Sequence, residues 1–207
     1  MELTDLERFF TAPDGKYHFA RWGRPIAPVV FGVEDATLGV IKGAIEAVVN
    51  LAGHEMADTD PELGANLLMF FIREWGELLE APQINDLLPD RDELVERLQS
   101  AEANQYRTFR IDENGAIKAA FIFIRMDNAM SELPAEDLAL VQAARVALLW
   151  ADGAFERVAP LVKAGDAVIL NPEIADLIRA AYDPVMPSFA NDASHALRLA
   201  ARLSASA

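Results

Sequence analysis

His54 and Glu55 are adjacent in the stretch GHEMADTD (53–60), which raises the question of a metal site. In the helix of a zinc peptidase, two histidines four residues apart share one face and bind the metal, and the glutamate between them acts as a general base. Asp58 stands here where the second histidine would be. The stretch therefore suggests His54, Glu55 and Asp58 as candidate metal ligands of a non-standard site.

The residues on either side of this stretch favour a helix end instead. Gly53 follows the last apolar position of a helical pattern, where glycine often takes the left-handed conformation that ends a helix. Asp58, Asp60 and Pro61 are typical of a loop. Protonated histidine interacts favourably with the last carbonyls of a helix, which gives His54 a structural role. We therefore expect no unbroken helix to carry the metal motif.

Other catalytic chemistries have no motif in this sequence. The chain has no cysteine, which excludes disulfides, thiolate zinc ligands and a cysteine nucleophile. Its remaining histidines, His18 and His195, are isolated from other candidate ligands. It contains no glycine-rich phosphate loop, G-x-S-x-G elbow or S-x-x-K motif. The sequence predicts no catalytic residue and no cofactor.

The composition is that of a folded globular protein. Of 207 residues, 52% are hydrophobic and 25% are charged, which predicts one domain over residues 1–207. Its core is expected over 16–187, followed by a C-terminal helix over 192–203 and a short disordered tail. The net charge of −15 repels phosphate backbones, so we expect no nucleic-acid partner. The partner is unknown, with a protein or a second copy of the chain as the possibilities.

The sequence carries no signal for export or for crossing a membrane. The opening MELTDLERFF has acids where a signal peptide has positive charge, and it lacks an apolar central region. Polar residues such as Lys42, Glu46 and Arg145 interrupt the longest apolar stretches, which excludes a membrane span. We expect a soluble, cytoplasmic protein.

Strand patterns predict a mixed β-sheet with a long β-hairpin packed against several helices, an α+β fold. The run LLMFFI (67–72) predicts a buried strand. Asn114-Gly115 between the runs 105–111 and 116–125 is the strongest local signal for a hairpin. The second of these runs loses its polar alternation after Lys118, which predicts that both of its faces are covered. Two further strands are expected over 17–22 and 26–33.

Helices are predicted from apolar periodicity and from helix start and stop signals. Pro134 is expected at the first position of a long helix that Asp152-Gly153 ends. Asn171 is expected to cap a helix that begins with Pro172. The predicted helices cover 3–10, 35–52, 73–80, 90–103, 134–150, 171–182 and 192–203.

Five stretches, taken in order, resemble an uncharacterised bacterial family. They are RWGRPI (21–26), the helix ending in Leu51-Ala52-Gly53, Gly64-Ala65-Asn66 before a strand, the turn DENG (112–115) and LNPEIADLIRAAYDP (170–184). This order is similar to that of a domain of unknown function with a zincin-like, matrixin-type metallopeptidase architecture, and the resemblance spans residues 21–201. It implies a zincin-like fold and, because the family is mostly exported, a location outside the cytoplasm.

The same resemblance implies that the metal motif is degenerate here. In that family, the helix after the long hairpin carries the metallopeptidase signature, and a short loop ending in Asp follows. With Asp152 matched to that Asp, VQAAR (141–145) stands where the signature would be. Val141 cannot bind zinc, Gln142 cannot act as a base, and the guanidinium of Arg145 repels a cation.

Three hypotheses about function remain open from the sequence. The first is a non-catalytic zincin-like domain, a degenerate metallopeptidase frame, that serves as a binding or scaffolding module. The second is a metal-dependent hydrolase with a non-standard site. The third is an oligomeric structural protein whose alanine-rich C-terminal helix packs against a second copy.

Overall fold

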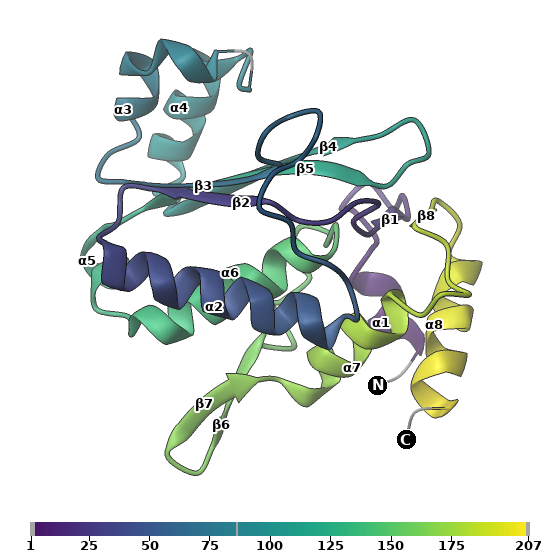
Figure 1. The fold of residues 1–207 in the computed structure, drawn as a ribbon. Coiled ribbons are helices and arrows are strands. Elements are labelled where there is room, and N and C mark those ends of the chain that lie inside the picture. Colours follow the sequence, from purple (N-terminus) through teal and green to yellow (C-terminus); the bar gives the residue numbers. More distant parts are fainter. Residues whose placement is uncertain (1–2, 86, 206–207) are drawn as a thin grey trace.

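The computed structural model describes residues 3–85 and 87–205, and a four-stranded mixed sheet forms its centre (Figure 1). The strand order is β2-β3-β5-β4, with β2, β3 and β5 parallel and β4 antiparallel to β5. This confirms the predicted α+β class, the mixed sheet and the long hairpin. The strands are β2 (Pro28–Phe31), β3 (Leu67–Ile72), β4 (Gln105–Ile111) and β5 (Ile117–Arg125).

The hairpin of β4 and β5 forms as its Asn-Gly pair predicts. Gly115 has a φ of 82°, in the left-handed region that glycine adopts without steric cost. The carboxylate of Asp112 accepts hydrogen bonds from the backbone N–H groups of Asn114 (2.8 Å) and Ala116 (3.0 Å). Local turn chemistry therefore pairs β4 with β5, and β4 is an edge strand because β5 pairs with β3 on its other side.

Helices cover both faces of this sheet (Figure 1). Phe121 and Phe123 of β5 face one apolar layer, and Ile122 and Ile124 face the other, which confirms that both faces of this strand are covered. The larger layer lies on α2 (Asp35–Leu51) and α6 (Ala135–Ala147). The smaller layer lies under α3 (Glu77–Glu80), the 3₁₀ turn η1 (Pro82–Ile84) and α4 (Arg91–Ser100).

Three further helices lie on the side of the molecule where both ends of the chain are found (Figure 1). The alanine-rich helix α8 contacts α1 and α7 of the same chain and buries His195, Ala196 and Leu199. This side of α8 is therefore not available to a second copy. The elements on this side are α1 (Leu3–Arg8), α7 (Pro172–Ala181) and α8 (Ser194–Ala205), with the paired strands β1 (Phe19–Ala20) and β8 (Phe189–Ala190). The short helix α5 (Asn128–Ser131) lies at the opposite side, at the left in Figure 1.

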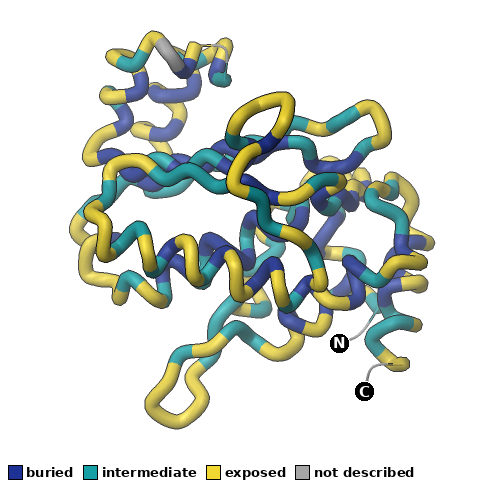
Figure 2. Tube along the Cα trace, viewed as in Figure 1, coloured by how far each residue is buried: buried dark blue, intermediate teal, exposed yellow. Residues whose placement is uncertain are grey.

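A second hairpin, absent from the sequence predictions, joins α6 to α7. It consists of β6 (Leu161–Ala164) and β7 (Ala167–Leu170), and its tip is exposed (Figure 2). After this hairpin, α7 begins as predicted, because the side-chain oxygen of Asn171 accepts a hydrogen bond from the N–H of Glu173 at 3.0 Å.

The long helix predicted over 134–150 is shorter than expected. Leu148 is extended and forms an antiparallel bridge with Arg21, and the N–H of Leu149 donates to the carbonyl of Ala20 at 2.9 Å. The apolar pattern alone favoured a helix that continues to Trp150. Pairing with the distant segment at Ala20 and Arg21 replaces this last helical turn. Pro134 lies at the N-cap, one position earlier than predicted.

Three other predicted elements also differ in length. The strand expected over 17–22 is regular only at Phe19–Ala20, and the one expected over 26–33 only at Pro28–Phe31. The helix expected over 73–80 begins only at Glu77. The predicted disordered tail falls partly on residues 206–207, outside the described residues, while Ser204 and Ala205 belong to α8. Among the described residues, no helix has the length and apolar character needed to cross a membrane.

Candidate functional site

Helix α6 brings VQAAR against the edge strand of the sheet. Gln142 is fully buried, and its Nε2 donates a hydrogen bond to Oε1 of Gln105 at 3.0 Å. The same oxygen accepts a hydrogen bond from Nη2 of Arg107 at 3.1 Å. Because side chains alternate along a strand, Gln105, Arg107 and Phe109 share the face of β4 that looks toward α6. A polar bridge therefore joins the two elements.

Beside this bridge lies a pocket of about 400 Å³, which we call the arginine pocket. Arg107 and Phe109 line it from β4, and Arg145 lines it from α6. The loop after α6 supplies the rest of its lining. That loop contributes Leu149, Trp150, Ala151, Asp152, Gly153, Ala154, Phe155 and Glu156.

The two guanidinium groups of this pocket lack acidic partners. The Nε atoms of Arg107 and Arg145 are both buried without a hydrogen-bond partner. Within residues 3–85 and 87–205, neither side chain forms an ion pair with a carboxylate. Buried positive charge without a counter-charge is unfavourable, because the groups lose hydration and gain nothing in return. The pocket thus presents two positive charges that have no ion-pair partner among the described residues.

Burial and mutual repulsion act on the charge of these groups. Burial lowers the pKa of Arg107 to about 10, with a further contribution from the charge of Arg145, while Asp152 acts in the opposite direction. Burial also lowers the pKa of Arg145. Since a pKa of about 10 lies well above neutrality, Arg107 remains protonated at pH 7. An anion in the pocket would relieve the repulsion and replace the lost hydration.

The aromatic side chains of Phe155 and Trp150 position Arg145. Its guanidinium carbon lies 5.0 Å from the ring centroid of Phe155, within the range of a cation–π contact. The ring of Trp150 meets Phe155 edge-on with centroids 5.0 Å apart, and Nε1 of Trp150 donates to the carbonyl of Ala144 at 3.0 Å. These contacts orient the charge without neutralising it.

Two carboxylates lie at the mouth of the arginine pocket. Asp152 and Glu156 are both exposed, so water screens their charges. They lie near the arginines without forming ion pairs with them. Their position at the mouth disfavours a highly charged anion more than a singly charged one, since repulsion grows with the charge of the ligand.

The motif GHEMADTD (53–60) directly follows the end of a helix. Helix α2 ends at Leu51, and Gly53 has a φ of 64°, which confirms the expected helix end. His54 donates a hydrogen bond from Nε2 to the carbonyl of Arg24 at 2.8 Å. Burial lowers the pKa of His54 despite this bond, which favours the neutral ring.

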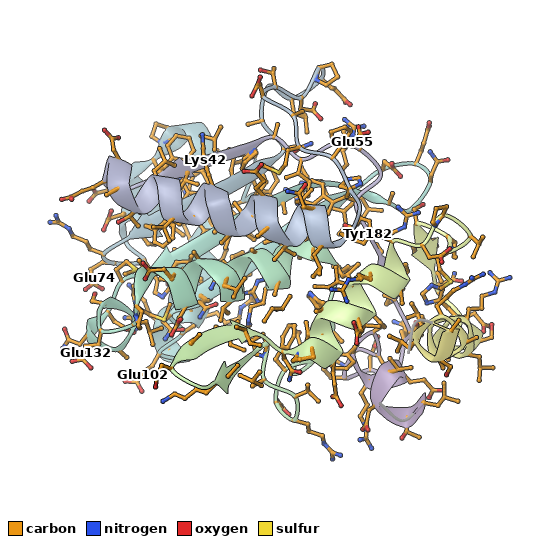
Figure 3. All side chains as sticks on the ribbon, turned by 60° about the horizontal axis from the view of Figure 1, so that its bottom comes forward. Lys42, Glu55, Glu74, Glu102, Glu132 and Tyr182 are labelled. Atoms are coloured by element: carbon orange, nitrogen blue, oxygen red, sulfur yellow. The ribbon has the colours of Figure 1, made fainter. Side chains whose placement is uncertain are left out.

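The candidate ligands of this motif do not converge on one point. Figure 3 shows Glu55 just beyond α2, and both Glu55 and Asp58 are exposed. In the part of the chain that the structure describes, no three His, Asp or Glu side chains are grouped so that they could hold a metal ion. The arrangement that a hydrolase using His54, Glu55 and Asp58 requires is therefore not present there.

Arg107 and Gln105 are the site residues that sequence reasoning missed. One signal was available, because Gln105 and Arg107 alternate with Tyr106 and Thr108 in a strand whose partner is apolar from Ala119 to Ile124. Alternation alone does not say which face meets a helix. The proximity of Arg107 to Arg145 depends on the packing of α6 and cannot be read from either segment.

No protein-family model, curated protein or solved structure matches this chain. Its function is therefore inferred from the pocket and its chemistry.

Proposed function

We propose that this chain is a non-catalytic binding module on a zincin-like, degenerate metallopeptidase frame, and that its arginine pocket holds a small anion. The observation that carries the proposal is the pair of half-buried guanidinium groups of Arg107 and Arg145, which form no ion pair with a carboxylate of the described residues. An anion supplies the missing acceptors and charge.

The side chains at 141–145 of α6 support a role without peptidase chemistry. Residues 141–145 are helical and lie beside a pocket, as a degenerate metal motif requires. Val141 offers no ligand atom, the amide of Gln142 is held by Gln105, and Arg145 brings positive charge. A divalent cation would therefore be repelled from the place where the family signature would hold it.

The expected affinity follows from the number of new hydrogen bonds. A hydrogen bond to a charged group contributes about 1.5–3 kcal/mol, and a carboxylate can accept one from each arginine. Two such bonds provide about 3–6 kcal/mol. Because about 4 kcal/mol corresponds to a dissociation constant of about 1 mM, a small carboxylate such as acetate should bind in the millimolar range.

A titration with acetate tests this function. Isothermal calorimetry or amide chemical shifts should show binding to the wild-type protein and at least about a tenfold loss in Arg107→Gln and in Arg145→Gln. The control is Arg73→Gln, which removes an exposed arginine outside the pocket. Equal acetate affinity in all four proteins would contradict the proposal.

A separate assay addresses the hydrolase alternative. The purified protein is incubated with Zn²⁺ and a general peptide substrate, and bound metal is quantified after dialysis. We expect neither stoichiometric zinc nor peptide hydrolysis. Zinc binding and proteolysis that are both lost in His54→Ala would favour the hydrolase with a non-standard site.

A further inference from the structure

A second hollow lies beside the arginine pocket and differs from it in chemistry. It has a volume of about 300 Å³ and lies between α6 and the hairpin of β6 and β7. Most of its lining is apolar, and we call it the apolar hollow. It is lined by Leu133, Leu138, Val141, Leu161, Val162 and Val168, with Gln105, Asp137 and Lys163.

The two hollows follow each other along the same two elements. On β4, Gln105 lines the apolar hollow and Arg107 lines the arginine pocket, and residues two apart on one face are separated by about 7 Å. On α6, Val141 lines the first and Arg145 the second, one helical turn apart, or about 6 Å. The hollows therefore lie next to each other along β4 and α6, and we call the pair of them the groove.

This groove has a charged half and an apolar half. From Arg145 to Leu138, α6 advances by about 10 Å, which is comparable to the length of an extended medium-length hydrocarbon chain. The apolar half continues to the hairpin, where Leu161 and Val168 are half-buried and line the hollow opposite α6. A molecule that fills both halves needs an anionic head and an apolar tail.

The head group is better matched by a carboxylate than by a phosphate. Arg107 and Arg145 both line the pocket, so each guanidinium group can donate one N–H to one of the two oxygens of a carboxylate. A phosphate monoester would bring close to two negative charges and a third oxygen toward Asp152 and Glu156 at the mouth. A monoanion satisfies the arginines with less repulsion from these acids.

We propose that the ligand of this groove is an amphipathic carboxylate whose head accepts hydrogen bonds from Arg107 and Arg145 and whose hydrocarbon chain lies in the apolar hollow. This inference rests on the proposed anion-binding function and specifies its ligand class. Full burial of a methylene corresponds to about a fourfold gain in affinity. An open groove removes about half of that surface from water, so each methylene should tighten binding about twofold.

Calorimetric titrations with acetate, hexanoate and decanoate test the inference on the wild-type protein. We expect the dissociation constant to fall with each increase in length, by about two orders of magnitude from acetate to decanoate. Decanol and decyltrimethylammonium carry the same tail without the negative charge. Both should bind at least about tenfold more weakly than decanoate, because neither brings a negatively charged acceptor to the arginines.

Two substitutions on β7 separate the tail from the head. Val168→Asp places a charge in the apolar hollow and should weaken decanoate binding at least about tenfold while leaving acetate binding unchanged. Ile169→Asp is the matched control, because Ile169 is the exposed neighbour on the opposite face of β7 and does not line the groove. Ile169→Asp should change the affinity for neither acetate nor decanoate.

The possible results distinguish this inference from the proposed function. Acetate binding that depends on Arg145 but does not increase with chain length would overturn the amphipathic ligand and leave anion binding intact. Failure of every carboxylate to bind would overturn both. Equal binding of decanol and decanoate would show a purely apolar site and would also overturn the inference.

Discussion

At the scale of single residues, Arg107 combines a cost in stability with a gain in binding capacity. Its Nε is buried without a partner, and burial, with a further contribution from the charge of Arg145, lowers its pKa. A side chain selected for stability alone would be apolar at this position, since unpaired buried charge destabilises the folded state. A binding role would explain an arginine at this position.

We expect Arg107→Met to raise the free energy of unfolding by about 1 kcal/mol while it abolishes acetate binding. The oxygen of Gln105 keeps its hydrogen bond from Gln142, so the substitution leaves no acceptor unpaired. Urea denaturation measures the stability. Arg73→Met is the control for loss of an exposed arginine, and a less stable Arg107→Met protein would contradict the expectation.

His195 gives a pH dependence at the residue scale. Burial, with a contribution from Arg198, lowers its pKa to about 4, and its Nδ1 accepts a hydrogen bond from the hydroxyl of Tyr17 at 2.8 Å. The neutral ring therefore carries its proton on Nε2, which is buried without a partner among the described residues, and a second proton would go to Nδ1, where it would displace the hydrogen bond from Tyr17 and charge a buried ring. The unfolded chain binds this proton near pH 6.5, which means that acidification from pH 6.5 to 4 favours unfolding.

We therefore expect the stability of the wild-type protein to fall over this pH range, and to fall less in His195→Gln. Thermal unfolding at half-unit intervals between pH 4 and 7 measures the difference. His18→Gln, which changes an exposed histidine, should keep the wild-type slope. The same slope in His195→Gln and the wild type would refute the assignment.

At the scale of elements, a side chain added at two glycines should have opposite effects on stability. Gly39 is exposed within α2, and an added Cβ would meet no atom within 4 Å. Gly115 has a φ of 82° in the β4–β5 turn, where an added Cβ would collide with the ring of Phe189. One position tolerates a side chain and the other excludes it.

Gly39→Ala should therefore stabilise the protein by about 0.5–1 kcal/mol, because alanine loses less conformational entropy in a helix. Gly115→Ala should destabilise it by about 2 kcal/mol through left-handed backbone strain and displacement of Phe189. Chemical denaturation of the two variants in parallel checks both signs. A neutral Gly115→Ala would mean that the turn relaxes without cost.

At the scale of the whole molecule, one hydroxyl joins three separate parts of the chain. Tyr182 follows α7 and lies near the C-terminal part of α2 in Figure 3. Its hydroxyl donates to the carbonyl of Ala147 at 2.7 Å and accepts from the N–H of Trp22 at 3.4 Å. The extended end of α6, which bounds the arginine pocket, is tied to the core through this group.

Tyr182→Phe should lower the free energy of unfolding by about 1–3 kcal/mol, because it leaves the buried carbonyl of Ala147 without this donor. Tyr106→Phe, at a partly exposed position on β4, is the matched control and should change stability by about 0.5 kcal/mol or less. Thermal denaturation compares the two. Equal losses would show that the buried hydrogen bond contributes nothing specific.

The sequence by itself determined the elements that local physics specifies. Asn114-Gly115 makes a hairpin turn, Asn171 caps a helix, and the apolar run of β5 requires cover on both faces, all through interactions within a few residues or through the solvation of one segment. Tertiary structure alone decided that Leu148 leaves α6 to pair with Arg21, and that Arg107 lies close to Arg145. Both outcomes depend on contacts between distant segments, whose free energies no local pattern contains.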